Sequence, residues 1–433
     1  MSDHLWIAAP SHASPATEQS LPAALLSEVD AHRHRRGPYT MAGTIMRAVV
    51  PVALARWPEL ASRHDIELLS VAPELRGSIR STRETLTSLA VPAERTRFYS
   101  RLRTLRLAHG LTEFLADHLR RLDDGPRSLV VRNIDDADPT DAELLSVLLR
   151  RLDPALLTLV VRTGTKPVAE PLGAALAAYA VPVVWSGHTS VPTPQGSTAE
   201  LAAVHVESDC TDDRPELVAA YERLPAAHRT ALHDRRAHAL RAMDEFSLRL
   251  GAIPLHAERG SDPAGAGALA LQEGLDYCID MGFYDATVNF GLRGRAVIDF
   301  ATQVEAWWTF TTKLTTALAA MGRPAEAEEL YAETIALSDK PAVHMQVAYA
   351  TGMLYTRHFD ADRKDHRRAK ALLNQAIAFA TVLFEGKERL FHTVFNRNGL
   401  ALVETHLGNL PAALRLVTEG LALLDRELEP DEH

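Results

Sequence analysis

The sequence predicts a multidomain protein in which an N-terminal α/β domain with a short parallel sheet precedes an all-α superhelix of helical hairpins. Two observations lead to this fold class. Short apolar runs alternate with helical patterns between residues 128 and 206, which is typical of a parallel sheet with crossover helices. From about residue 268 only helical patterns remain, and one helix-pair spacing recurs between Leu314 and Leu424.

The composition is that of an ordinary globular protein. The chain has 433 residues, of which 46% are hydrophobic and 24% are charged, so two or three domains are expected. A net charge of −10 makes nucleic acid an unlikely principal partner. Cys210 and Cys278 are too few for a disulfide framework, and neither a signal peptide nor a membrane-spanning run is recognisable. We therefore expect a cytoplasmic protein without a membrane partner.

The C-terminal half repeats a pattern of small and large apolar residues. Gly322 precedes Ala327 by five residues, and Gly408 precedes Ala413 by the same interval. A small residue at a tight turn and another where two helices cross suit antiparallel helices packed face to face. Ala369 repeats the second half of the spacing, and Gly282 marks an earlier pair, which gives about four pairs. This arrangement resembles the tetratricopeptide repeat, whose helix pairs stack into a superhelix.

The resemblance implies that the first helix of each pair lines a concave, partner-binding face. Counting back from each turn predicts polar side chains there, suited to a protein or peptide ligand. The predicted partner-binding residues are Gln272, Glu273, Asp276, Thr309, Thr312, Lys313, Thr316, Gln346, Tyr349, Arg357, Asn398, Thr405 and His406. The sequence stops directly after a repeat helix with no solvating cap, so we expect either a truncated chain or another chain covering that end.

A second resemblance concerns residues 129–163. The apolar run at 129–131, the Ala137-Asp-Pro139 tripeptide, the helix at 141–152 and the strand at 156–161 are similar to the core of STAND-type P-loop ATPases. In that family two acidic residues at the strand end hold Mg²⁺ and orient the attacking water. The aligned residues here are Arg132 and Asn133, which cannot do this, so only Asp135 and Asp136 could replace them.

The phosphate loop implied by this resemblance is also altered. Residues 37–44 keep only part of the Gly-x-x-x-x-Gly-Lys-Ser/Thr pattern. Ala42 replaces the second glycine and Gly43 replaces the lysine. Gly37, Thr40, Gly43 and Thr44, with Asp135 and Asp136, are the nucleotide-binding candidates. The family's cofactor would be ATP, but the replaced residues predict a degenerate module without a required cofactor.

These patterns predict four segments: a flexible tail at 1–20, a degenerate STAND-like α/β domain at 21–210, a helical connector at 211–262, and repeats at 263–433. Within the α/β segment we expect helices at 21–29, 45–57 and 96–119, a strand at 65–71, and further strands at 181–185 and 202–206. His228, His233 and His238 are spaced by five, so they share no helix face. Surface histidines, no metal site and no catalytic residues are therefore expected.

Three functions remain open from the sequence. The first is a non-catalytic scaffold or regulator that binds a protein or peptide through the concave face of the array. The second is a nucleotide-dependent ATPase switch of the STAND type, whose phosphate chemistry uses residues outside the alignment. The third is an accessory subunit that presents a substrate to a separate modifying enzyme. The identity of the partner, the pathway and the oligomeric state are not encoded in any recognisable pattern.

Overall fold

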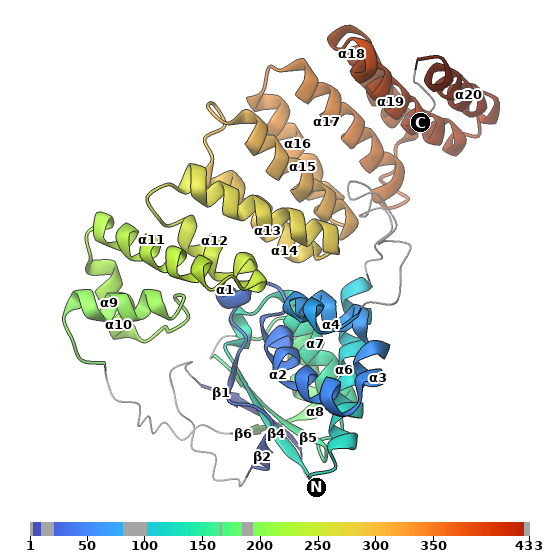
Figure 1. Cartoon of the computed structure of the whole chain (residues 1–433). Helices are drawn as coiled ribbons and strands as arrows, with labels where there is room; N and C mark the ends of the chain where they lie inside the picture. The colour runs from blue at the N-terminus through green and yellow to red at the C-terminus, as the bar shows by residue number, and fades with distance from the viewer. Residues whose placement is uncertain (1–2, 10–20, 81–101, 165–166, 184–193, 428–433) are drawn as a thin grey trace. The chain divides into compact units, whose positions relative to one another are not determined.

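A computed structural model describes residues 3–9, 21–80, 102–164, 167–183 and 194–427. The described chain forms a small parallel sheet with helices in its N-terminal part, and then only helices (Figure 1). This confirms the predicted α/β domain followed by a helical array. The chain divides into two compact units, Met1–Phe310 and Thr311–His433, and each is described by itself.

The sheet lies in the first unit and, within the described residues, has six strands. They are β1 (His4–Ala8), β2 (Ala23–Ala24), β3 (Val29–Asp30), β4 (Arg127–Arg132), β5 (Leu157–Thr163) and β6 (Ala180–Val183). The order is β2-β4-β5-β1-β6, β3 also pairs with β4, and every pairing is parallel. The predicted strands at 129–131 and 156–161 are therefore confirmed. The strand predicted at 181–185 is confirmed for residues 181–183, and residues 184 and 185 lie outside the described ones.

Strand β1 corrects the predicted N-terminal tail. It lies between β5 and β6, where Leu5 is opposite both Val160 and Val181. Leu5 and Ile7 are buried, so the prediction of a flexible segment is wrong for residues 4–8. Residues 10–20 of the predicted tail lie outside the described residues. A five-residue strand whose partners are more than 150 positions away gives almost no local signal.

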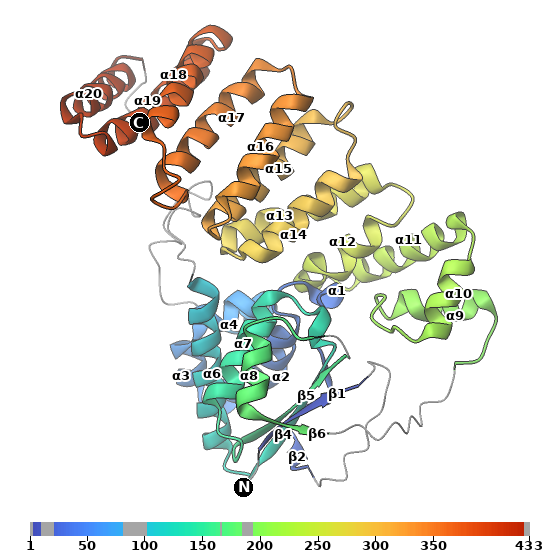
Figure 2. The ribbon, with the colours of Figure 1, turned by 180° about the vertical axis from the view of Figure 1, so that it is seen from behind.

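One face of the sheet carries the main core of the unit. Leu129, Val131 and Leu159 point to this face and pack with the helices, while Val130 and Val160 belong to the opposite face. Figures 1 and 2 show the helices of this domain gathered beside the sheet. They are α1 (Arg33–Arg36), α2 (Thr40–Arg56), α3 (Pro58–Arg63), α4 (Asp65–Val71), η1 (Pro73–Gly77), α6 (Arg103–Leu122), η3 (Ile134–Asp136), α7 (Pro139–Arg151) and α8 (Leu172–Tyr179).

Three predicted elements differ from the structure. Residues 65–71 form helix α4 and not a strand, with acidic Asp65 and Glu67 in the first turn, where the helix dipole favours them. Residues 202–206 lie in helix α9 (Thr198–Glu207) and not in a strand. Residues 21–29 contain β2 and the start of β3 where a helix is predicted. The predicted helix at 96–119 corresponds to α6 from Arg103 on, and its first residues lie outside the described ones.

The rest of the first unit is helical. Its elements are α10 (Pro215–Arg223), α11 (Ala226–Ala242), η4 (Phe246–Leu250), α12 (Ala252–Ala257), η5 (Pro263–Gly267), α13 (Ala268–Met281) and α14 (Tyr284–Val297). Leu271, Cys278 and Phe290 of the α13–α14 pair belong to the same buried core as the α/β domain. Phe283, between these two helices, lies 5.1 Å from the ring of Tyr39. The compact unit therefore continues past the predicted boundary at residue 262.

The second unit is a series of packed helices. After α15 (Val304–Ala320), which spans the division between the units, it contains α16 (Pro324–Leu337), α17 (Pro341–Met353), η6 (Leu354–His358), α18 (His366–Leu383), α19 (Gly386–His406) and α20 (Leu410–Glu427). The predicted turn residues Gly322 and Gly408 both have φ of 78°, a conformation that glycine adopts without strain. The predicted crossing residues Ala327, Ala369 and Ala413 are all buried, as helices in close contact require.

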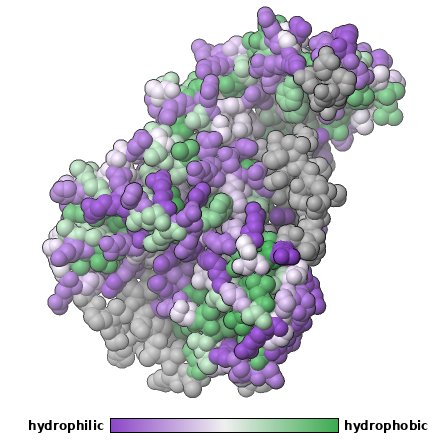
Figure 3. Space-filling view, in the orientation of Figure 1, coloured by the Kyte–Doolittle hydropathy of each residue, from purple (hydrophilic) through white to green (hydrophobic). Residues whose placement is uncertain are grey.

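The last helix leaves apolar side chains at the surface. Leu410, Leu414, Val417 and Leu421 of α20 are exposed. Figure 3 shows hydrophobic residues reaching the surface at this end of the array, among hydrophilic ones. Among the helices of the described residues, none is both long and apolar enough to cross a membrane.

Candidate functional site

The predicted phosphate loop is mostly helix. Gly37 follows the short helix α1 with φ of 71°, and α2 begins at Thr40, so Gly43 and Thr44 lie inside a helix. The Thr40 hydroxyl donates to the Gly37 carbonyl at 2.8 Å, and the Thr44 hydroxyl donates to the Thr40 carbonyl at 2.7 Å. Both hydroxyls thus serve their own backbone.

The first backbone amides of α2 bind a carboxylate of the same chain. The N–H groups of Met41 and Ala42 donate to the two oxygens of Asp141 at 2.8 and 3.0 Å, and the Tyr39 N–H donates to the Thr140 hydroxyl at 3.1 Å. Asp141 is fully buried, and this burial raises the pKa of its carboxyl to about 7 despite the two amide donors. The position at a helix N-terminus where a P-loop protein holds phosphate is therefore taken by Asp141.

The order of the strands also separates residues 37–44 from the usual place of a phosphate loop. Such a loop follows a buried strand. Residues 37–44 follow β3, which has two residues and pairs with β4 alone, whereas the strand buried between two neighbours at the start of the chain is β1. Residues 9–20, which follow β1, contain neither glycine nor lysine.

The two residues at the positions of the family's acidic pair, Arg132 and Asn133, bind an aspartate of the same chain. Arg132 and Asn133 hold the buried carboxylate of Asp30, with nitrogen–oxygen distances of 3.0 Å each. Asp135 and Asp136 lie in the exposed turn η3 just beyond the end of β4, and Asp135 accepts the backbone N–H of Gly164. The two carboxylates that could replace the family's acidic pair are therefore exposed, and that of Asp135 is already bonded within the chain.

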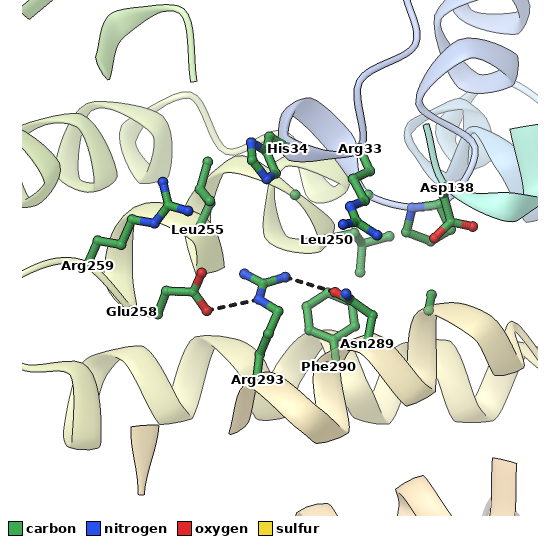
Figure 4. Close-up of a pocket in the computed structure, with 14 residues that line it drawn as sticks. Arg33, His34, Asp138, Leu250, Leu255, Glu258, Arg259, Asn289, Phe290 and Arg293 are labelled. Atoms are coloured by element: carbon green, nitrogen blue, oxygen red, sulfur yellow. Dashed lines mark hydrogen bonds and ion pairs between the residues drawn. The ribbon is translucent and has the colours of Figure 1, made fainter. Parts of the chain in front are cut away.

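The first unit contains a cavity of about 290 Å³, which we call the arginine pocket. Residues from α1, from the turn after it, from η4 and α12, and from α14 surround it (Figure 4). The lining residues are Arg33, His34, Gly37, Pro38, Asp138, Leu250, Gly251, Leu255, Glu258, Arg259, Ala286, Asn289, Phe290 and Arg293. Gly37 is required here because a Cβ at this residue would lie 1.9 Å from the Leu250 carbonyl oxygen.

Arg293 occupies the centre of the arginine pocket. Its Nε donates to Glu258 at 2.9 Å, and one terminal nitrogen donates to the Asn289 side-chain oxygen at 3.2 Å. The guanidinium lies 5.4 Å from the centre of the Phe290 ring. Its other terminal nitrogen is buried and has no hydrogen-bond partner among the described residues. Arg293 is thus held firmly with one charged donor unused.

Two exposed arginines, Arg33 and Arg259, and the partly buried His34 also line the pocket. Figure 4 shows Arg33 directed toward Asn289 and Arg293, with His34 between Arg33 and Arg259. Burial and the neighbouring cations lower the pKa of His34 to about 2, so its imidazole is neutral at physiological pH. Its Nδ1 is buried without a hydrogen-bond partner among the described residues. Burial raises the pKa of the Asp138 carboxyl above its usual value.

The predicted partner-binding residues are distributed over α13, α15, α17, η6 and α19. Several are engaged within the helices: the hydroxyls of Thr309, Thr316 and Thr405 donate to carbonyls of their own helix, one turn earlier. Tyr349 packs on Phe395 with ring centres 4.6 Å apart. These predicted residues are divided between the two units. The first unit contains Gln272, Glu273 and Asp276, and the second contains Thr312, Lys313, Gln346, Arg357, Asn398 and His406.

A cavity of about 380 Å³, which we call the apolar groove, lies on a different side of α17. It is formed by α16, α17 and α18, with apolar side chains such as Ile335, Val347 and Leu372. Its other lining residues are Glu328, Tyr331, Ala332, His344, Ala348, Thr351, Arg368 and Gln375. None of the predicted partner-binding residues lines it. On α17, Gln346 and Tyr349 are each one position away from Val347 and Ala348, which turns them to other faces of the helix.

One histidine is placed differently from the prediction of a surface residue. His233 is fully buried, where it contacts the Tyr221 hydroxyl at 2.7 Å and the His256 ring nitrogen at 2.8 Å. Burial lowers the pKa of His233 to about 3, so its imidazole is neutral at physiological pH. Within the described residues, no group of three or more His, Cys, Asp or Glu side chains is placed to hold a metal ion.

The arginine pocket and the Asp141 contacts were not found from the sequence. Their residues come from segments up to 260 positions apart, so no local sequence motif joins them. The only signals visible in the sequence are the cationic residues near position 33 and the acidic Asp141 shortly after Asp138. No protein-family model matches this sequence, and no curated protein matches it. The site is therefore interpreted from its geometry alone.

Proposed function

We propose that the protein is a non-catalytic scaffold or regulator whose helical second unit binds a protein or peptide partner. The observation that carries this proposal is the apolar groove. Its apolar side chains come from three successive helices, and Ile335 remains 39% exposed. A concave apolar surface with a few polar groups around it is suited to an anchoring side chain of a partner.

The polar side chains of the apolar groove add a means of orientation. Glu328 lies 3.5 Å from Arg368 and 3.7 Å from Arg363, and it also accepts the Tyr355 hydroxyl. These charges are held in place within the unit, so they present a fixed pattern to a partner. We infer that an apolar partner side chain enters the groove while partner backbone groups contact Gln375 and His344 at its edge.

The contacts of the first unit argue against nucleotide turnover. Asp141 occupies the α2 amides, and no Gly-Lys pattern follows β1. If the chain were an ATPase switch, Mg-ATP would raise its melting temperature and Thr44→Ala would abolish that rise. We expect no rise that depends on Thr44, because its hydroxyl already donates within α2.

The groove is tested by filling it. Ala332→Trp places a large side chain in the groove from an exposed position, so the fold is expected to be retained. Affinity capture from a native cell extract with the full chain should recover a partner with the wild type and lose it with Ala332→Trp. The matched control is Ala336→Trp, one turn further along the same helix and also exposed, which does not line the groove. If both variants retain every partner, the groove is not the binding surface.

A further inference from the structure

The arginine pocket has the chemistry of an anion site, and it is independent of the apolar groove. Arg33, Arg259 and Arg293 line it against Glu258 and Asp138. Glu258 is bound to Arg293, and Asp138 caps α7 through Thr140. The Arg33 carbonyl accepts the backbone N–H of Gly37, but within the described residues its guanidinium makes no hydrogen bond or ion pair. The positive charge of the lining therefore exceeds the negative charge, and part of it is unpaired.

A buried donor indicates where an anion would bind. A charged nitrogen of Arg293 is buried without an acceptor among the described residues, and Nδ1 of the neutral His34 ring is buried without a hydrogen-bond partner among them. Leaving a charged donor buried and unbonded costs more than a typical hydrogen bond gives, so such a group calls for an acceptor that the described residues do not supply. Glu258 and Asn289 already fix the orientation of Arg293, so an anion would find its donor pre-positioned.

We propose that the arginine pocket binds a phosphate group, either as inorganic phosphate or on a small phosphate monoester. The guanidinium donors approach from three directions, with Arg33 on α1, Arg259 after α12 and Arg293 on α14. A tetrahedral phosphate presents oxygens to all three, whereas a planar carboxylate pairs best with one guanidinium. The volume of about 290 Å³ is at the small end for ligand pockets, which favours a compact molecule.

The proposal is tested by isothermal titration of the full-length protein with inorganic phosphate at constant ionic strength set by chloride. We expect saturable binding of one phosphate per chain. Arg33→Gln and Arg293→Gln should each weaken it by about tenfold or more, the loss expected for a hydrogen bond to a charged group. The Arg33 side chain is exposed and makes no other hydrogen bond or ion pair among the described residues, so its variant is expected to keep the fold even if Arg293→Gln does not.

Two further variants separate a built site from general charge. Arg249→Gln removes a cation next to Leu250 that pairs with Asp244 outside the pocket, and it should leave phosphate affinity unchanged. Glu258→Gln removes the competing carboxylate with the same shape, and it should tighten binding several-fold. Equal weakening by Arg33→Gln and Arg249→Gln would overturn the proposal, as would a lack of saturation at millimolar phosphate.

The identity of the phosphate carrier is resolved by competition. A sugar phosphate and a nucleoside monophosphate are titrated beside inorganic phosphate, and tighter binding of one of them with the same dependence on Arg33 identifies the monoester class. Succinate is the carboxylate probe. If succinate binds as tightly as phosphate and with the same dependence on Arg33, the assignment to phosphate is wrong.

Discussion

Asp141 shows how one buried side chain can take the place of a ligand. Its carboxylate accepts the Met41 and Ala42 amides, which are the groups that a helix N-terminus offers to an anion. The same side chain satisfies these donors permanently, at the cost of burying an acid. That cost appears as the raised pKa of its carboxyl.

The first prediction concerns this carboxyl and pH. In the unfolded chain its pKa is near 3.8, and in the folded protein it is raised to about 7. Between these values the folded state holds a proton that the unfolded state has lost, so this group's contribution to stability decreases as pH rises. We expect Asp141→Asn to remove a decrease on the order of 2 to 4 kcal/mol between pH 4 and pH 7. Urea unfolding across this range measures it, and identical pH slopes in both proteins would contradict it.

The second prediction concerns Gly37. A Cβ at this residue would collide with the Leu250 carbonyl, in addition to the strain of its positive φ. We expect Gly37→Ala to lower the free energy of unfolding by about 3 kcal/mol or more. Gly125→Ala is the control, because Gly125 also has a positive φ but a Cβ added there would meet no atom within 4 Å. Gly125→Ala should lower the free energy of unfolding by about 1 kcal/mol. Equal losses for the two variants would show that the contact between Gly37 and Leu250 is not tight.

At the scale of the elements, the helical hairpins were predicted well because their signal is local. The turn residue Gly322 and the buried Ala327 lie within one short segment, and the same physical requirements recur along the chain. The strand β1 was missed because its partners are distant. Helix α9, however, has a signal that the sequence does show. Ser197 and Glu200 form a capping box, which marks the start of a helix where a strand was predicted.

The third prediction tests the close packing of these helices. Ala369 of α18 is fully buried, and Ala371 of the same helix is exposed. We expect Ala369→Leu to destabilise the second unit by about 1 to 3 kcal/mol through overpacking. Ala371→Leu should change stability by about 0.5 kcal/mol or less. Denaturant unfolding of the two variants compares them directly, and a tolerated leucine at Ala369 would indicate a loosely packed crossing.

The sites could be predicted only in part, for a related reason. The replaced residues Arg132 and Asn133 were recognisable, since they follow a clear apolar strand, and they bind Asp30 in the structure. The arginine pocket was not recognisable, because Arg33 and Arg293 come together only when the α14 helix packs in the first unit. On α17 the predicted residues Gln346 and Tyr349 and the groove residues Val347 and Ala348 lie on different faces, and no turn glycine marks that pair in the sequence.

At the scale of the whole molecule, the chain divides into its two compact units after Phe310, so the first unit includes residues on both sides of position 262. The reason lies in the core. Leu271, Leu275 and Phe290 of the α13–α14 pair are buried together with side chains of the α/β domain. A hairpin that belongs to the repeat pattern in sequence therefore belongs to the N-terminal unit in structure.

The fourth prediction follows from this division. A fragment of residues 1–320, which retains the whole of α15, should fold cooperatively, because its core is complete. A fragment of residues 1–262 lacks the α13–α14 side chains and should not give a cooperative unfolding transition. Near-ultraviolet circular dichroism and urea titration distinguish the two. A cooperative transition in the shorter fragment would show that the core does not need this hairpin.

Cys278 lies completely inside the core of the first unit, and burial holds the pKa of its thiol well above the usual range. The chain's other thiol, Cys210, has its pKa raised to about 11. A maleimide or disulfide reagent needs an accessible thiolate, so its reaction with Cys278 must wait for the surrounding helices to separate. Cys278 is thus a natural probe of local unfolding. In a Cys210→Ser variant, the alkylation rate of Cys278 measures how often the N-terminal unit opens, without any attached dye.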